Sequence, residues 1–209
     1  MVRVISLRGE EPEPGLLQNA VESLKSGKLV VYPTETVYGL GADATSDEAV
    51  TRVFNAKSRS RDDPVSIAVD SLSMSYYVGK LGPIEETLIR KLLPGPLTVL
   101  VEYRPVLSNI LSAGTGKVGV RVPDQPVTRK LIRLFGGPIT STSANISGKD
   151  SPTSVDEALN QLGSSVDFVI DVGESLIGES STVVDVVEGE IEIVREGPLS
   201  KFEIESALG

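Results

Sequence analysis

Short aliphatic runs alternate with segments of helical periodicity along most of this 209-residue chain. Apolar positions spaced three and four residues apart predict helices near 17–24, 49–54, 84–92, 127–132 and 155–162. Runs rich in Val, Ile, Leu and Thr predict strands at 29–32, 65–69, 97–103, 117–123, 138–143, 166–172, 182–187 and 191–195. Such alternation favours an α/β fold. Because the later strands follow one another closely, we expect a mixed rather than a wholly parallel sheet.

Three capping boxes predict where helices begin: Thr45-x-x-Glu48, Ser154-x-x-Glu157 and Ser200-x-x-Glu203. The segment LPGPLT (93–98) predicts a rigid turn between a helix and a strand, since Pro fixes φ and Gly permits tight geometry. Pro12-Glu13-Pro14 is expected to be a flexible lead-in. Residues 1–209 show no internal repeat or linker, so we predict a single domain without a C-terminal accessory domain.

The composition excludes several classes of protein. Cysteine and histidine are both absent, so no disulfide framework and no Cys/His zinc site can form. Aromatic residues make up only 4% of the chain, and Val, Ile and Leu must therefore supply the core. The sequence shows no leader pattern and no apolar run approaching 18 residues. We therefore expect a cytoplasmic protein with no membrane association.

The charge is distributed unevenly. The whole chain carries a net charge of −9, which argues against a generally basic nucleic-acid-binding surface. Residues 156–209 hold 13 acidic and 2 basic residues, net −11, and residues 1–155 hold 16 acidic and 18 basic, net +2. The stretch 52–61 contains four cations and no acid, which indicates either a solvated helix end or a positive pocket on an acidic protein.

Two short motifs supply groups that bind anions. Lys57 and Arg59 lie in AKSRSRDDP, and Ser143 and Asn145 lie in TSTSANISG. Arg offers a planar fork and Lys a movable charge, whereas hydroxyl and amide groups after a strand can cradle an anion. Alternatively, Lys57 compensates the dipole at a helix C-terminus, and Ser143 and Asn145 cap a local turn. The cluster contains no Cys or His nucleophile, so chemistry here would depend on positioning and electrostatics.

Two further segments are candidates for binding. PTETVYGLGADAT (33–45) follows a predicted buried strand and shows no apolar periodicity, and α/β proteins place ligands at such strand ends. An ordinary turn is the alternative, and neither GxxxxGK[ST] nor GxGxxG is present. In the run 117–123, valines alternate with Lys117, Gly119 and Arg121, which places these two cations on the face opposite the valines.

Seven motifs in order resemble one known family. PTETVYGL, K-x-R followed by Pro, PGPLT, VRVP, S-x-N-x-SG, STVVD and REG extend over about residues 15–200. They are similar to those of the YrdC-like family of threonylcarbamoyl-adenylate synthases in its short form. The resemblance implies a YrdC/RibB-like fold, with a twisted mixed sheet and flanking helices around a large positive cavity. It also implies a nucleotidyltransferase that makes threonylcarbamoyl-AMP and pyrophosphate from ATP, L-threonine and bicarbonate or CO2.

The resemblance also implies roles for particular residues. Lys57 and Arg59 are expected to be catalytic, as the main groups that stabilise charge on the phosphates. Contacts to ATP are expected from Arg59, Asp63, Lys117, Ser143, Asn145, Ser151 and Arg195. Contacts to threonine are expected from Thr34, Arg121, Ser141 and Thr182. Mg2+ is expected to accompany ATP without a protein ligand.

The resemblance extends to partners and has two departures that bear on the site. A separate transferase complex would place the threonylcarbamoyl group on the adenosine beside the tRNA anticodon, with possible weak tRNA binding by this chain itself. Many family members carry a histidine in the strand after the K-x-R loop, where this chain has Ala68. Lys117 stands where a hydroxyl residue is common.

Two other functions compete with the synthase. A non-catalytic module that binds tRNA or double-stranded RNA would use a positive cavity, but the acidic chain lacks interleaved aromatic and basic residues. A carbamoyl-transfer domain like those of hydrogenase-maturation proteins would accompany acylphosphatase and zinc-finger-like segments. A chain without His and Cys cannot supply those segments in full.

Overall fold

The computed structural model of the chain describes residues 2–7 and 14–209. Pro12 and Glu13 of the expected lead-in lie outside the described residues, and Pro14 begins the first helix. Within the described residues, eleven strands form one sheet in the order β1-β9-β2-β3-β8-β4-β7-β6-β10-β11, with β5 paired to β6 off this path. The strands are β1 (Arg3–Ser6), β2 (Val30–Tyr32), β3 (Gly39–Gly41), β4 (Ser66–Ala68), β5 (Gly79–Lys80), β6 (Leu97–Tyr103), β7 (Lys117–Arg121), β8 (Ile139–Ser143), β9 (Phe168–Asp171), β10 (Thr182–Val187) and β11 (Glu190–Arg195).

The sheet is mixed, as expected. β9 is parallel to both β1 and β2, β4 is parallel to β7, and β6 is parallel to β10, whereas the other neighbours are antiparallel. Three antiparallel pairs in a row join β2, β3, β8 and β4, and parallel and antiparallel pairs alternate from β8 to β11. The twisted mixed α/β architecture of the prediction is confirmed.

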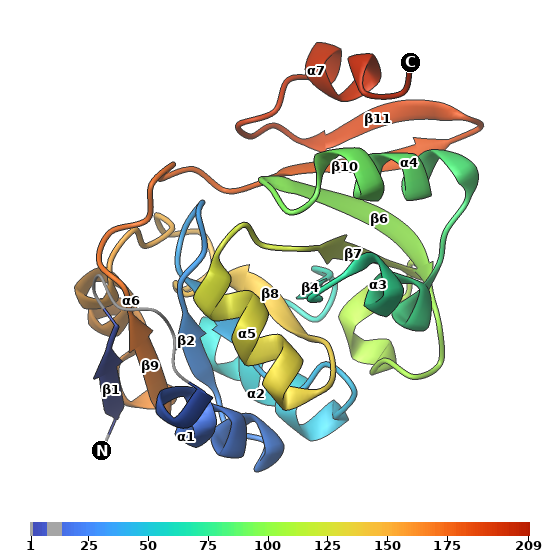
Figure 1. Cartoon of the computed structure of the whole chain (residues 1–209). Helices are drawn as coiled ribbons and strands as arrows, with labels where there is room; N and C mark the ends of the chain where they lie inside the picture. The colour runs from blue at the N-terminus through green and yellow to red at the C-terminus, as the bar shows by residue number, and fades with distance from the viewer. Residues whose placement is uncertain (1, 8–13) are drawn as a thin grey trace.

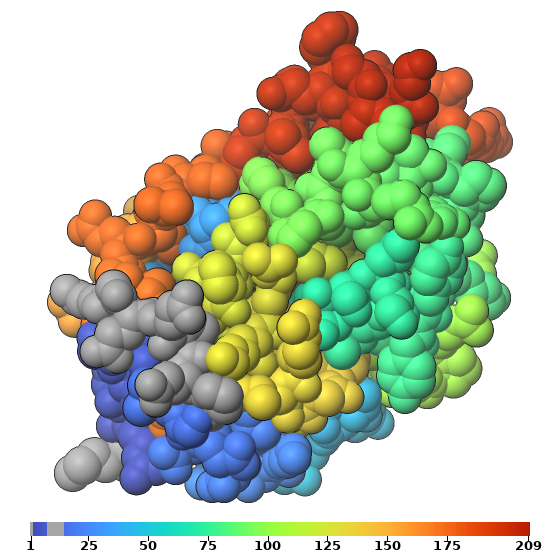
Figure 2. All heavy atoms as spheres, viewed as in Figure 1, coloured from blue at the N-terminus to red at the C-terminus, as the bar shows by residue number. Residues whose placement is uncertain are grey.

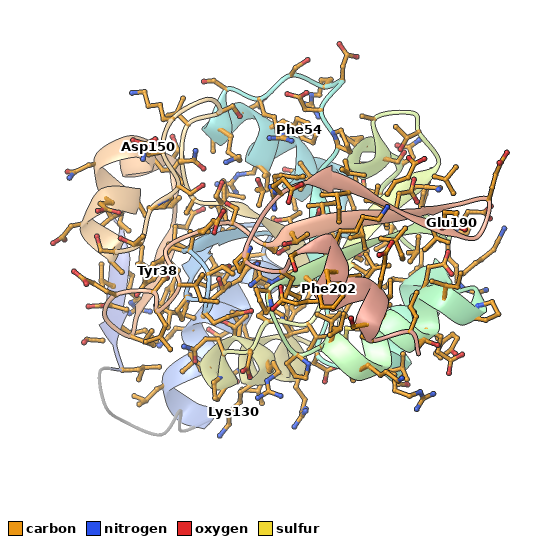
Figure 3. The ribbon with its side chains drawn as sticks, turned by 90° about the horizontal axis from the view of Figure 1, so that it is seen from above. Tyr38, Phe54, Lys130, Asp150, Glu190 and Phe202 are labelled. Carbon is orange, nitrogen blue, oxygen red and sulfur yellow. The ribbon has the colours of Figure 1, made fainter. Side chains whose placement is uncertain are left out.

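Seven α-helices within the described residues cover the sheet (Figure 1). They are α1 (Pro14–Lys25), α2 (Asp47–Lys57), α3 (Leu72–Val78), α4 (Pro83–Leu92), α5 (Pro126–Phe135), α6 (Val155–Leu162) and α7 (Lys201–Ser206). Phe54 of α2 and Lys130 of α5 lie on opposite sides of the ribbon in Figure 3. Burial of aliphatic side chains between these helices and the sheet is the main favourable term in folding.

Three apolar clusters fill the space between helices and sheet. One joins α1 and α5 to β2 and β9, another joins α2 and α6 to β3 and β9, and the largest joins α2, α3 and α4 to β4, β6, β7 and β10. Figure 2 shows the C-terminal segment, in red, at one end of the molecule. These clusters consist of apolar side chains, so the polar side chains of the central strands do not belong to the core.

The predicted reciprocal capping boxes are correct in one case of three. Ser200 and Glu203 form the reciprocal capping box at α7. At α2 the predicted box is wrong, because the Thr45 hydroxyl donates to Asp43 Oδ1 at 2.7 Å and Ser46 caps the helix instead. At α6, Ser154 caps as predicted, but the Glu157 carboxylate accepts from the Thr153 amide (2.7 Å) rather than from Ser154.

The loop 33–45 is a second correction, because a strand lies within it. β3 pairs with β2 and β8, and the segment 29–42 is fully buried. The glycines of β3 lie against the Tyr32 ring: a Cβ at Gly39 would lie 2.7 Å from Tyr32 Cζ, and one at Gly41 would lie 3.0 Å from the ring. Glycine in a strand often marks such a close approach. The elements β1, α3 and β5 were also not predicted.

Candidate functional site

A polar cavity opens over the centre of the sheet, with an empty volume of about 640 Å³ including its mouth. β3, β4, β6, β7, β8 and β11 each contribute a lining residue, and so do the loops at 34–37, 59–65 and 180–181. The strand register places Ser66 opposite Ser141, and Gly39 opposite Ser143. Serine and threonine hydroxyls therefore gather on one face of adjacent strands. A cavity with this polar lining suits a charged ligand.

Three arginines line the cavity: Arg59, Arg121 and Arg195. Burial lowers the pKa of Arg195, and repulsion by Arg121 and Arg59 lowers it further. Burial also lowers the pKa of Arg59, against the opposing effect of Asp63. Because guanidinium groups remain charged near neutral pH, the cavity collects positive charge in a protein that is acidic as a whole.

Arg121 is the most deeply placed of the three arginines, with only 5% of its surface exposed. Its Nη2 atom donates to Glu35 Oε1 (2.7 Å) and to Thr36 Oγ1 (2.8 Å). Its Nε atom is buried and has no hydrogen-bond partner. A buried donor without a partner costs free energy, so a bound anion that satisfied it would be favoured.

The loop 33–37 around Arg121 is held firmly. Glu35 Oε2 accepts from the Asp124 amide (3.1 Å), and the Thr128 hydroxyl donates to the Pro33 carbonyl. The Thr34 hydroxyl accepts from the amides of Thr36 and Val37 at 3.2 and 3.1 Å. Thr34 therefore lies at the cavity, but its hydroxyl already serves the turn.

The second loop, 143–147, is held from behind by Lys57, which is 1% exposed. Lys57 Nζ donates to the carbonyl oxygens of Ser143 and Asn145, the latter at 2.7 Å, and to Asn145 Oδ1 at 3.1 Å. Burial, and then the charge of Arg59, lowers the pKa of Lys57 from 10.5 to about 7. Oxygen acceptors favour the ammonium form and burial opposes it.

Arg59 and Arg195 keep part of their donor capacity for the cavity. Arg59 donates to the carbonyls of Asp63 (3.2 Å) and Pro64 (2.9 Å), and Arg195 donates to the Ser181 carbonyl from Nε (3.2 Å) and Nη2 (2.7 Å). Each guanidinium has five N–H donors. These carbonyl contacts orient the two groups, which leaves the remaining donors for a ligand.

Six of the predicted residues line the cavity, and six do not. The lining set is Thr34, Arg59, Arg121, Ser141, Ser143 and Arg195. The others are Lys57, Asp63, Lys117, Asn145, Ser151 and Thr182.

Besides Lys57 and Asn145, which bond to each other, two more residues of the second set are engaged in structural contacts. Lys117 pairs with Asp185 at 2.6 Å, and Thr182, which is fully buried, donates from Oγ1 to the Leu199 carbonyl at 2.8 Å. Ser151 lies within hydrogen-bond reach of the lining residue Ser180, at 3.3 Å.

Sequence reasoning missed the lining residues Ser66, Thr98 and Ser181. It also missed Glu35, which pairs with Arg121. Glu35 is the acidic residue of the PTET motif. An acid in a loop that follows a buried strand is the sequence feature that could have indicated a buried ion pair. Ser181 directly precedes the predicted Thr182, and the strand phase decides which of the two faces the cavity. Ala68 pairs with Arg121 in the sheet and packs in the core shared by α1 and α5.

The described residues offer little for a resident metal. No group of three or more Asp, Glu, His or Cys within 2–7 and 14–209 is placed to hold a metal ion. The carboxylate of Glu35, next to the lining residue Thr34, already pairs with Arg121. In the same part of the chain, no helix is long and apolar enough to cross a membrane.

Comparisons with known proteins agree on one family. The Sua5/YciO/YrdC family model, which carries the description "Telomere recombination", matches residues 22–197. A threonylcarbamoyl-AMP synthase of Pyrococcus abyssi is 40% identical over 210 residues, which cover 100% of this chain and 62% of the relative. A threonylcarbamoyl-AMP synthase of Bacillus subtilis is 35% identical over 199 residues, which cover 94% of this chain and 57% of the relative.

Solved structures give the same result. P. abyssi Sua5 complexed with L-threonine superposes with a TM-score of 0.93 at 40% identity and covers 99% of this chain and 61% of that one. E. coli YciO superposes with a TM-score of 0.86 at 25% identity and covers 94% and 96% of the two chains. The chain thus spans about three fifths of the length of the P. abyssi relatives that it matches.

Proposed function

The chain belongs to the Sua5/YciO/YrdC family, and we propose that it is a threonylcarbamoyl-AMP synthase, a nucleotidyltransferase that uses ATP, L-threonine and bicarbonate. One observation carries the proposal: three arginines line a single cavity, and the most buried of them keeps an unpaired donor. Such a cavity suits a reaction between two anionic substrates. The relatives named for this activity favour it over an RNA-binding module.

Threonine is proposed to bind beside Arg121. Its carboxylate would satisfy the unpaired Nε atom, while Glu35 and Thr36 hold Nη2 in place. Because the guanidinium is fixed before the ligand arrives, little entropy is lost on binding. Ser141 and Ser181 line the cavity and Thr182 does not, so these two serines are proposed to contact the rest of the amino acid.

The ATP phosphates are proposed to bind between Arg59 and Arg195. Both guanidinium groups are partly desolvated and repel each other, so a polyphosphate between them relieves that repulsion. Mg2+ would enter as the MgATP complex, because the described residues supply no carboxylate cage for it. Its chemistry would be to share the phosphate charge with the two arginines.

The reaction then follows from positioning. The threonine ammonium first releases a proton to solvent. The free amine then adds to CO2 and releases a second proton to solvent, or condenses with bicarbonate and releases water, to give a carbamate. A carbamate oxygen forms a bond to the α-phosphorus as the bond from that phosphorus to the bridging oxygen breaks, and pyrophosphate leaves. Arg59 and Arg195 stabilise the charge that develops on the phosphate oxygens. Holding both substrates in one cavity removes the entropic cost of their encounter.

The product has a mixed anhydride bond, so a second enzyme must take the threonylcarbamoyl group. We propose that this acceptor enzyme is a transferase complex acting on tRNA, with both steps in the cytoplasm. The threonylcarbamoyl-AMP synthases of P. abyssi and B. subtilis, to which the chain is similar, support the synthase step.

Mass detection of threonylcarbamoyl-AMP tests the proposal. Incubation with MgATP, L-threonine and bicarbonate should give that product together with an equal amount of pyrophosphate. Omission of threonine is the control and should abolish both. ATP turnover that does not depend on threonine would overturn the proposal. Binding of tRNA with steep salt dependence and without ATP turnover would also overturn it.

A further inference from the structure

Lys57 ends helix α2 directly behind the loop 143–147. Its ammonium carries three hydrogens and meets three acceptors: the carbonyls of Ser143 and Asn145 and the Oδ1 atom of Asn145. The donor capacity of Nζ is therefore fully used. Since Lys57 is 1% exposed and is not a lining residue of the cavity, no donor remains for a phosphate.

The backbone of Lys57 holds the same loop. Its carbonyl accepts from the Ser147 amide at 2.8 Å, so one residue fixes both ends of the segment 143–147. A buried cation that meets only neutral oxygens is costly, and an apolar residue of equal length would fill the space without that cost. The cation therefore needs a functional reason.

Asn145 transmits the effect of Lys57 to the cavity wall. Its Nδ2 atom donates to the carbonyls of Ile146 (3.0 Å) and Lys149 (2.6 Å), which fixes the amide with Oδ1 towards Lys57. Oδ1 also accepts the hydroxyl hydrogen of Ser143. Because a hydroxyl has one hydrogen, Ser143 turns only its lone pairs to the cavity that it lines.

We propose that Lys57 is a positioning residue: acting through Asn145, it fixes Ser143 as a hydrogen-bond acceptor at the cavity wall and does not contact substrate. Ser143 then takes a donor group of the substrate, such as the carbamate N–H, rather than a phosphate oxygen. This inference rests on the proposed function. It separates two cations of one K-x-R motif, since Arg59 faces the cavity and Lys57 does not.

Hydrogen exchange of the ligand-free protein tests the structural half of the proposal, whatever the reaction is. Lys57→Met keeps the length and removes the charge, and Arg59→Met is the matched control two residues away. We expect the amides of 143–147 to exchange about tenfold or more faster in Lys57→Met and unchanged in Arg59→Met. Unchanged exchange in Lys57→Met would overturn the proposal.

Binding and turnover test the functional half. Arg59→Met should raise the Kd for MgATP about tenfold or more, and Lys57→Met should change it less than about threefold while turnover falls about 100-fold. Ser143→Ala should cost nothing further in the Lys57→Met background, because both changes remove the same acceptor. If the losses of turnover in Ser143→Ala and Lys57→Met multiply in the double variant, the proposal is contradicted. A selective loss of ATP affinity in Lys57→Met would also contradict it.

NMR of the wild-type protein tests whether Lys57 contacts ATP even if Lys57→Met fails to fold. The buried ammonium of Lys57 should give a separate 15N signal, which should move little when MgATP is added. A large shift of that signal on ATP binding would show a phosphate contact and overturn the proposal. If no variant and no wild-type protein binds ATP at all, the proposed function fails, and the exchange result still decides the role of Lys57 in the loop.

Discussion

Two loops wall the cavity, 33–37 and 143–147, and a buried cation holds each of them by a different means. Arg121, which lines the cavity, pairs with the Glu35 carboxylate and keeps a buried Nε that has no partner among the described residues. Lys57 meets only neutral oxygens, and its donors are all used behind the wall. Burial of a cationic side chain therefore does not by itself show that it binds substrate. The two cations differ in that Arg121 keeps an unpaired donor, whereas every donor of Lys57 Nζ is paired.

The largest expected effect is at Arg121. Arg121→Gln should reduce threonine-dependent pyrophosphate release about 1000-fold, because the carboxylate loses its fixed donor. It should also lower the free energy of unfolding by about 3–5 kcal/mol, because Glu35 becomes a buried charge without a partner. Chemical denaturation and a coupled pyrophosphate assay measure the two losses.

A double variant separates the loss of turnover from the loss of stability. Glu35→Gln with Arg121→Gln removes both charges, so most of the stability should return while turnover stays low. Recovery of turnover together with stability would mean that Arg121 serves the fold alone, and the contrast between the two loops would then fail.

Arg59 and Arg195 come next, because they face the cavity from its exposed side. Arg59→Ala or Arg195→Ala should reduce kcat/KM for ATP about 100-fold, while the free energy of unfolding changes by less than about 1 kcal/mol. Steady-state kinetics at saturating threonine and a denaturation curve check both values. Near-normal kcat/KM in both variants would show that Arg59 and Arg195 do not bind the ATP phosphates.

The pKa of Lys57 gives a smaller effect with a definite sign. The folded protein holds this pKa at about 7, through burial and then Arg59, whereas the unfolded chain keeps about 10.4. Between these pH values the unfolded state binds more protons. The free energy of unfolding should therefore rise with pH, by up to about 1.4 kcal/mol per unit from this group.

Lys57→Met lacks the titrating group, so the comparison isolates it. The difference in unfolding free energy, wild type minus variant, should grow from pH 7 to pH 10 and stay constant below about pH 6. A difference that stays flat across this window would show that Lys57 keeps an ordinary pKa.

The smallest expected effect is at Gly39. A Cβ there would lie 2.7 Å from Tyr32 Cζ, so Gly39→Ala should lower the free energy of unfolding by about 1–3 kcal/mol. Gly15→Ala is the control, because a Cβ at that position meets nothing within 4 Å and alanine favours a helix. Thermal melts of both variants give the comparison, and equal melting temperatures would show that the Tyr32 packing tolerates the methyl group.

The sequence predicts the long elements well and the close contacts poorly. β6 and β10 begin and end where their apolar runs do, and the first three residues of each strand are buried. β3 was missed because its glycines oppose strand propensity, and only the Tyr32 ring explains them.

The candidate site divides in the same way. Motif order placed Arg59, Arg121, Ser143 and Arg195 together at one cavity. It could not tell that Lys57 and Asn145 satisfy each other, because hydrogen-bond saturation depends on three-dimensional contacts. The phase of one strand likewise decided between Ser181 and Thr182.

A crystal structure with ATP, L-threonine and bicarbonate tests the central contrast most directly. The account predicts a threonine carboxylate oxygen about 3 Å from Arg121 Nε, and Lys57 Nζ still bound to Ser143 and Asn145 with no phosphate oxygen in hydrogen-bond range. A phosphate oxygen about 3 Å from Lys57 Nζ, with the threonine carboxylate away from Arg121, would contradict it.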